Sequence, residues 1–270
     1  MLDFAQLEDL DALKALWLAC FGGPAEYLDF YYSRRFVPGD TLVWREEGRP
    51  VSMMTLMRVR RGGEDGVYIY AVATLPEYRG RGLMRRLDAW SQEIAWKRGC
   101  RFSVLVPAEP ELFAMYEKLG YRADFPIWVK EIRGPAKAPG RFSACSFAEF
   151  RELRRRFLFH IPGAVLHPDG ELRYIYDELH TFSGEVLRYE EQGRPCYVAF
   201  TQEERGLLIR ETIGSDPVKT AKELLLRYGA ERALVRYFRP ARGFRETPFG
   251  MGRRLDGGSL SRGYMALMLD

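Results

Sequence analysis

Several features that mark specialised protein classes are missing from this 270-residue sequence. It has no run of about 18 apolar residues, the length that a membrane-spanning helix requires. Its first residues are acidic and lack the basic and apolar regions of a signal peptide. The four cysteines are scattered and form no C-x-x-C pair, which is usual in a reducing compartment. They are Cys20, Cys100, Cys145 and Cys196. We therefore expect a soluble cytoplasmic protein without membrane association.

Metal ligands and a strong charge of one sign are also scarce. The three histidines, His160, His167 and His180, do not have the close spacing of metal ligands, so we expect no metal. No G-x-S-x-G motif is present to supply a hydrolase nucleophile. Lys and Arg number 41 against 37 Asp and Glu, a net charge of +4. This small excess does not predict nucleic acid as a partner.

The sequence contains enough apolar residues, 47% of the chain, for two ordinary domains. In the first half, helical spacing predicts helices over 7–21, 27–36, 83–97 and 111–119. Runs of β-branched and aromatic residues predict strands over 41–45, 51–59, 67–74, 102–106 and 125–132. In the second half we expect helices over 147–159, 171–179 and 218–228, and strands over 186–189, 196–200, 207–212 and 233–238.

The second half repeats the order of elements of the first. Residues 42–51 align without a gap with residues 187–196, and both segments contain a Gly-Arg-Pro turn. Gly243-Phe244-Arg245 then stands where Gly120-Tyr121-Arg122 stood. Between the halves lies a stretch rich in Pro and Gly, which is typical of a linker. We predict a diverged duplication with domains at 1–133 and 142–270, joined by a linker at 134–141.

The most informative segment follows the strand predicted at 67–74. It reads Arg79-Gly80-Arg81-Gly82, and a helix begins at Leu83. Glycines let a ligand approach the backbone, and the first amides of a helix have no partner within the helix. The positive end of the helix dipole attracts anions, so this turn predicts a diphosphate site to which the two arginines add counter-charge.

Two other phosphate loops fit these residues less well. A Walker loop requires Lys-Ser or Lys-Thr after its last glycine, and neither dipeptide follows Gly82. A dinucleotide-binding fingerprint requires three glycines, and Arg85 stands in the third place.

The segment from Val72 to Leu83 resembles the cofactor motif of the GCN5-related N-acetyltransferase (GNAT) superfamily, Q/R-x-x-G-x-G/A. Arg79 and Gly82 match that motif, and Met84 departs from it. Residues 112–121 are similar to a second family segment, A-x-x-L/F-Y-x-K-x-G-F/Y. The resemblance implies an α/β (α+β) fold with two GNAT-like domains, each a mixed, mostly antiparallel twisted sheet flanked by helices, the second degenerate.

The resemblance also implies an N-acetyltransferase that uses acetyl-CoA or another acyl-CoA as co-substrate. The amine attacks the thioester directly, and Tyr116 acts as general acid toward the departing thiolate. Glu109 is a candidate general base, and an exposed loop carboxylate is an equally good interpretation of it. The implied cofactor-binding residues are Val72, Ala73, Thr74, Arg79, Gly80, Arg81, Gly82, Leu83 and Met84.

The tandem arrangement is similar to that of the enhanced intracellular survival acetyltransferases, without the third domain that those proteins carry. In those relatives the terminal carboxylate reaches the active site, a role that Asp270 would have here. The second loop, residues 213–218, lacks paired glycines, and Asp216 would repel a diphosphate, so we expect no CoA there. The acceptor stays open between a small-molecule amine and a protein amine. The alternative function is a non-catalytic acyl-CoA sensor or interaction module.

Overall fold

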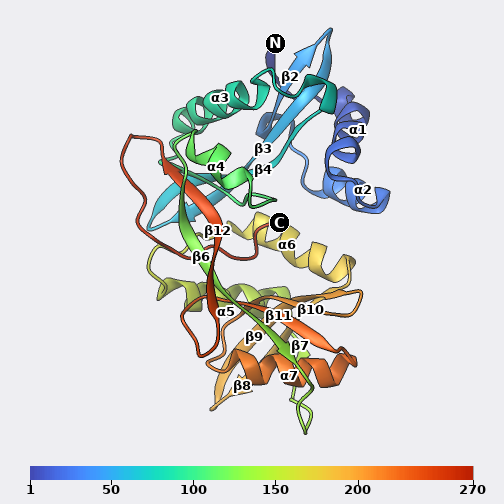
Figure 1. The fold of residues 1–270 in the computed structure, drawn as a ribbon, viewed down its shortest axis with the longest axis vertical. Helices are drawn as coiled ribbons and strands as arrows, with labels where there is room; N and C mark the ends of the chain where they lie inside the picture. The colour runs from blue at the N-terminus through green and yellow to red at the C-terminus, as the bar shows by residue number, and fades with distance from the viewer. Residues whose placement is uncertain (270) are drawn as a thin grey trace. The chain divides into compact units, whose positions relative to one another are not determined.

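The computed structural model describes residues 1–269, and the chain forms two compact units (Figure 1). The first unit contains residues 1–124 and 250–261. The second contains residues 125–249 and 262–269. Asp270, for which the sequence suggested a role, lies outside the described residues.

The sheet of the first unit is mostly antiparallel. Its strands follow the order β1 (Leu2–Phe4), β2 (Thr41–Glu46), β3 (Arg49–Arg61), β4 (Glu64–Thr74), β5 (Phe102–Leu105) and β12 (Arg245–Arg254). Among the described strands of this unit, β4 and β5 are the parallel pair, and a helix connects them. The strand β12 comes from near the end of the chain and pairs antiparallel with β5, with Met251 opposite Leu105 and Arg254 opposite Phe102.

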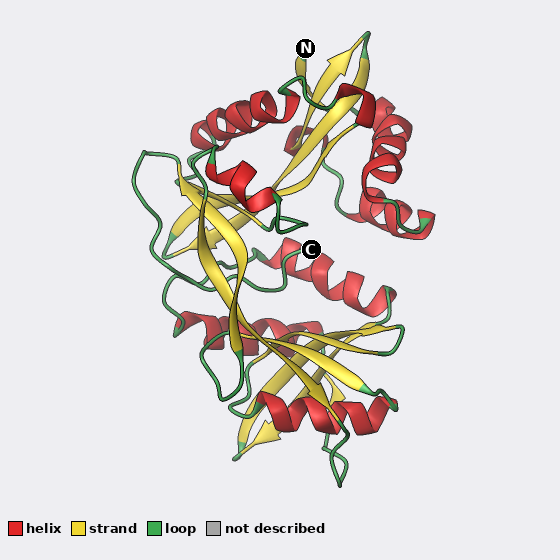
Figure 2. Cartoon of the chain, viewed as in Figure 1, coloured by secondary structure: helices red, strands yellow, loops and turns green. Residues whose placement is uncertain are grey.

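Helices cover both faces of the strands β2 to β4. Figure 2 shows α1 and α2 on one side of these strands, and α3 and α4 on the other. These helices are α1 (Leu10–Phe21), α2 (Ala25–Arg34), α3 (Leu83–Lys97) and α4 (Leu112–Glu117), with short 3-10 turns at Leu7–Asp9, Pro38–Asp40 and Pro76–Tyr78. The helix α3 has the predicted bounds. Leu83, Leu87, Ser91 and Ala95 recur on its buried face, and Gly99 follows its end at a φ of +83°.

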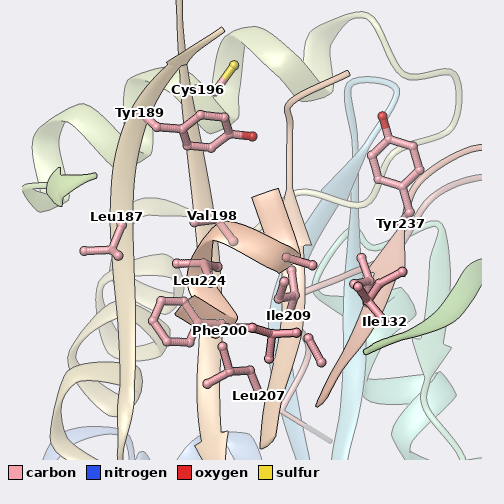
Figure 3. Close-up of a cluster of buried hydrophobic side chains, with 14 of the residues drawn as sticks. Ile132, Leu187, Tyr189, Cys196, Val198, Phe200, Leu207, Ile209, Leu224 and Tyr237 are labelled. Atoms are coloured by element: carbon pink, nitrogen blue, oxygen red, sulfur yellow. The ribbon is translucent and has the colours of Figure 1, made fainter. Parts of the chain in front are cut away.

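The second unit has the same mixed architecture. Its strands follow the order β6 (Arg122–Arg133), β11 (Arg232–Tyr237), β10 (Gly206–Thr212), β9 (Arg194–Glu203), β8 (Gly184–Glu191) and β7 (Ser143–Ala144), and only β10 and β11 run parallel. Its helices are α5 (Phe147–Phe159), α6 (Asp169–Thr181) and α7 (Pro217–Tyr228). Apolar side chains of β8, β9 and β10 pack with Leu224 of α7 in one core cluster (Figure 3). Mixed, mostly antiparallel sheets flanked by helices in both units confirm the predicted fold class.

The strands that end the two sequence repeats have changed places. After Gly120-Tyr121, β6 begins at Arg122 and pairs through residues 128–133 with β11 of the second unit. After Gly243-Phe244, β12 begins at Arg245 and pairs through residues 251–254 with β5 of the first unit. A strand from each repeat therefore extends the sheet of the other. The boundaries predicted at residues 133 and 142 stay a prediction.

Candidate functional site

The strands β4 and β5 separate partway along their length. Residues 66–69 of β4 pair in parallel with residues 102–105 of β5, and the pairing within the described residues stops there. The strand β4 continues to Thr74 along β3. Residues 70–74 therefore have one edge that the neighbouring strand β5 does not cover, and backbone groups on such an edge can bind an extended ligand.

A bulge lies in β4 just beyond the point of separation. Tyr70 is opposite Thr55 and Ala73 is opposite Met53, so Ala71 and Val72 together face a single residue, Met54. Ala71 has a φ of +51°, a left-handed conformation that alanine rarely adopts. Bulges redirect backbone and side-chain groups out of the regular ladder. The bulge therefore includes Val72, one of the residues that the family resemblance implied as cofactor-binding.

The predicted diphosphate turn is open at both glycines. Gly80 and Gly82 have φ values of +77° and +73°, and Gly82 is the N-cap of α3. A Cβ atom added to either glycine would meet no heavy atom within 4 Å. Both residues are exposed, and neither carries a side chain that could cover the first amides of α3.

The two arginines of the turn fold back onto the loop. Arg79 donates from Nε to the carbonyl oxygen of Thr74 at 3.1 Å, and its Nη2 lies 3.8 Å from Cys20 Sγ. Arg81 donates to the carbonyl oxygen of Glu77 at 3.0 Å, and its guanidinium lies 4.7 Å from the centre of the Tyr78 ring. Both guanidinium groups therefore lie beside the turn. The backbone around Gly80 and Gly82 stays open. Met84, which departs from the family motif, is half-buried in the first turn of α3.

Tyr116 and Glu109 lie in different surroundings. Tyr116 is on α4, 6% exposed, and its ring meets that of Tyr121 edge-on at 5.8 Å. Burial raises the pKa of Tyr116 to about 12, so its phenol remains protonated at neutral pH. Glu109 is exposed in the segment after β5, and its carbonyl oxygen accepts the Leu112 N–H at 3.1 Å.

A buried polar network supports these elements, and the sequence did not predict it. Tyr121 donates its hydroxyl to Asp88 of α3 at 3.0 Å and accepts from Ser103 of β5 at 3.1 Å. Arg253 of β12 lies 3.4 Å from Asp88. Burial raises the pKa of Asp88, while Arg253 and the Tyr121 hydroxyl oppose that rise. In the sequence, the signal for this network was Asp88, a charged residue directly after the apolar Leu87 of α3.

Comparison with known proteins agrees with this geometry. Residues 2–123 match the family model described as "Acetyltransferase (GNAT) domain". Over these residues the chain is similar to the GNAT acetyltransferases. Over 79 residues the chain is 37% identical to the glucosamine 6-phosphate N-acetyltransferase of Trypanosoma brucei brucei. The match covers 28% of this chain and 53% of that protein, so the chain spans about half the length of this curated relative.

Solved structures are similar over both units. A GCN5-related N-acetyltransferase from Anabaena variabilis ATCC 29413 has a TM-score of 0.74 and 19% identity, over 94% of this chain and 72% of that one. Eis1 from Mycobacterium abscessus has a TM-score of 0.66 and 13% identity, over 95% of this chain and 74% of that one. A tandem GNAT protein from the clavulanic acid biosynthesis pathway has a TM-score of 0.57 and 16% identity, over 96% of this chain and 100% of that one. These matches confirm the predicted tandem-GNAT fold.

Residues 1–269, the part of the chain that the structure describes, contain neither a candidate membrane span nor a candidate metal cluster. Among residues 1–269, no helix has both the length and the apolar character needed to cross a membrane. The same residues contain no group of three or more His, Cys, Asp or Glu side chains placed to hold a metal ion.

Proposed function

We propose that the chain is an N-acyltransferase that moves an acetyl group from acetyl-CoA to a primary amine. The observation that carries this proposal is the open glycine turn at the start of α3, next to the separation of β4 from β5. The match of residues 2–123 to the GNAT domain supports acyl-CoA as the donor. The acceptor is an amine of a small molecule or of a protein, and the chain works in the cytoplasm.

In this proposal the turn from Arg79 to Met84 holds the diphosphate of the cofactor through backbone N–H groups. The uncovered edge of Val72, Ala73 and Thr74 holds the pantetheine arm. Backbone N–H groups at the bulge donate to the thioester carbonyl oxygen and stabilise the negative charge that develops there.

Direct transfer then needs two proton movements. The amine nitrogen forms a bond to the carbonyl carbon, the C–S bond breaks, and its electron pair goes to sulfur. Tyr116 gives its phenolic proton to the thiolate, and a pKa raised to about 12 keeps that proton in place beforehand. Glu109 is the candidate that takes the proton released by the amine.

Calorimetric titration with acetyl-CoA tests the cofactor site. Gly82→Trp places a bulky side chain over the first amides of α3 and should weaken binding about 100-fold, as expected for the loss of two charge-assisted hydrogen bonds. Gly99→Trp is the matched control, because Gly99 is also left-handed with open space around it, at the other end of α3.

Unchanged acetyl-CoA affinity in Gly82→Trp, or an equal loss in Gly99→Trp, would remove the cofactor site from the turn. Binding without turnover across a broad panel of amines would favour the sensor function over the enzyme.

A further inference from the structure

The second unit contains a counterpart of the diphosphate turn. The strand β10 leads through residues 213–216 into α7, just as β4 leads into α3, and a parallel strand follows each helix. Asp216 is the N-cap of α7, because its side chain accepts the Lys219 N–H at 2.9 Å, and Pro217 is the first helical residue. The helix α7 therefore begins one residue before the helix predicted over 218–228.

A carboxylate of the chain lies where the counterpart of a cofactor diphosphate would lie. Glu191, at the end of β8, accepts the Ser215 N–H at 2.5 Å and the Asp216 N–H at 3.1 Å. These are two backbone donors at the positive end of α7, and a half-buried anion bound there is stabilised as a phosphate would be.

Neighbouring side chains close the remaining space. A Cβ atom added to Gly214 would lie 2.0 Å from the Tyr189 hydroxyl, whereas the glycines of the first turn have no neighbour within 4 Å. The Tyr237 hydroxyl also donates to the Gly214 carbonyl oxygen at 2.8 Å. Tyr189 stands beside Cys196 at one end of the core cluster (Figure 3).

The equivalent carboxylate in the first unit is held elsewhere. In the aligned hairpins Glu191 corresponds to Glu46 and Tyr189 to Trp44. The indole N–H of Trp44 donates to Glu46 at 2.7 Å, and this bond keeps the carboxylate on its own hairpin. Tyrosine has no indole N–H, so this particular bond is not available to Glu191.

We propose that Glu191 is a built-in anionic ligand of the second unit, which occupies the phosphate position at α7 and limits the chain to a single acyl-CoA, bound in the first unit. The limit to one cofactor rests on the function proposed above. The occupation of α7 by Glu191 does not, because it follows from contacts within the second unit alone.

Inorganic pyrophosphate is the probe that tests this inference. We compare the wild-type chain with Glu191→Ala and with the double variant Glu191→Ala/Asp216→Asn. Asparagine keeps the N-cap acceptor while it removes the second negative charge. Glu190→Ala is the matched control, since Glu190 is the exposed neighbour of Glu191 on the same strand.

Glu191→Ala should lower the melting temperature by about 4 °C, which corresponds to the loss of two charge-assisted hydrogen bonds, and Glu190→Ala should change it by less than about 1 °C. By calorimetry the wild type should bind one pyrophosphate and the double variant two. Circular dichroism identifies any variant that has not folded, and Glu191→Gln then replaces alanine as the milder change.

Three results would overturn the proposal: a second pyrophosphate on the wild type, no additional one on the folded double variant, or equal melting temperatures for Glu191→Ala and Glu190→Ala. In a further outcome, the wild-type chain binds no pyrophosphate and the double variant binds one. This would count against the cofactor site of the first unit and support the role of Glu191.

Discussion

At the scale of single residues, Tyr116 gives the sharpest test of the proposed chemistry. Tyr116→Phe removes the phenolic proton and should lower kcat about 100-fold, while the dissociation constant of acetyl-CoA changes less than about threefold. Because burial raises the pKa of Tyr116 to about 12, the proton is lost only as the pH approaches that value. The kcat profile of the wild type should therefore show no fall between pH 7 and 9 from this residue.

A descending limb near pH 8 in the wild type that disappears in Tyr116→Phe would contradict the raised pKa of Tyr116, since it would require a tyrosine that loses its proton near pH 8. Steady-state kinetics of both chains from pH 6 to 10 supply the comparison. Loss of acetyl-CoA binding with unchanged kcat would make Tyr116 a packing residue.

Residue chemistry also explains which parts of the site the sequence revealed. Gly80 and Gly82 are informative because few residues other than glycine adopt left-handed conformations, and both have a positive φ. Ala71 also has a positive φ, but alanine carries no such signal, so the bulge was not predicted. The inward turn of Arg79 depends on Cys20 and Thr74, partners that a local pattern does not identify.

At the scale of elements, the pairing of β4 with β5 depends on one glycine. A Cβ atom on Gly66 would lie 2.4 Å from the ring of Phe102, which is fully buried. Gly66→Ala should therefore cost about 2 kcal/mol by overpacking, and it should weaken acetyl-CoA binding because β5 moves away from β4. Urea unfolding measures the first effect, and calorimetry measures the second.

Gly39→Ala is the control for this prediction, because its Cβ atom meets no neighbour and its backbone is not left-handed. An equal cost in the two variants would show that the contact with Phe102 does not set the spacing of the strands.

Local patterns predicted the elements whose partners lie nearby in the sequence. The helices α3 and α5 have the predicted bounds, because apolar residues recur at helical spacing between clear end signals. The strand β12 was not predicted, since its sequence, RETPFGMGRR, contains a proline, two glycines and four charged residues. Its place beside β5 depends on a partner about 150 residues earlier in the chain. The strands β1 and β7 are too short to give a pattern.

At the scale of the whole molecule, the exchanged strands make the first repeat incomplete by itself. A fragment of residues 1–133 lacks β12, so Asp88 loses Arg253 and Glu64 loses Arg254, which contacts it at 2.9 Å. The outer edge of β5 also loses its partner. We expect this fragment to show no cooperative thermal transition.

Residues 1–124 joined through a flexible linker to residues 250–261 should recover that transition, because this combination contains the whole first unit. Differential scanning calorimetry of both chains provides the measurement. A cooperative transition of the 1–133 fragment at the melting temperature of the full chain would show that β12 is dispensable.

The late arrival of β12 also has a consequence during synthesis. The ribosome releases β5 about 150 residues before β12, a delay of roughly 7 to 30 s at ordinary translation rates. Throughout that interval the nascent chain exposes an unsatisfied row of amide and carbonyl groups, which can pair with another newly made copy. Chaperone demand in the cell should therefore depend on how fast the part of the message between β5 and β12 is translated.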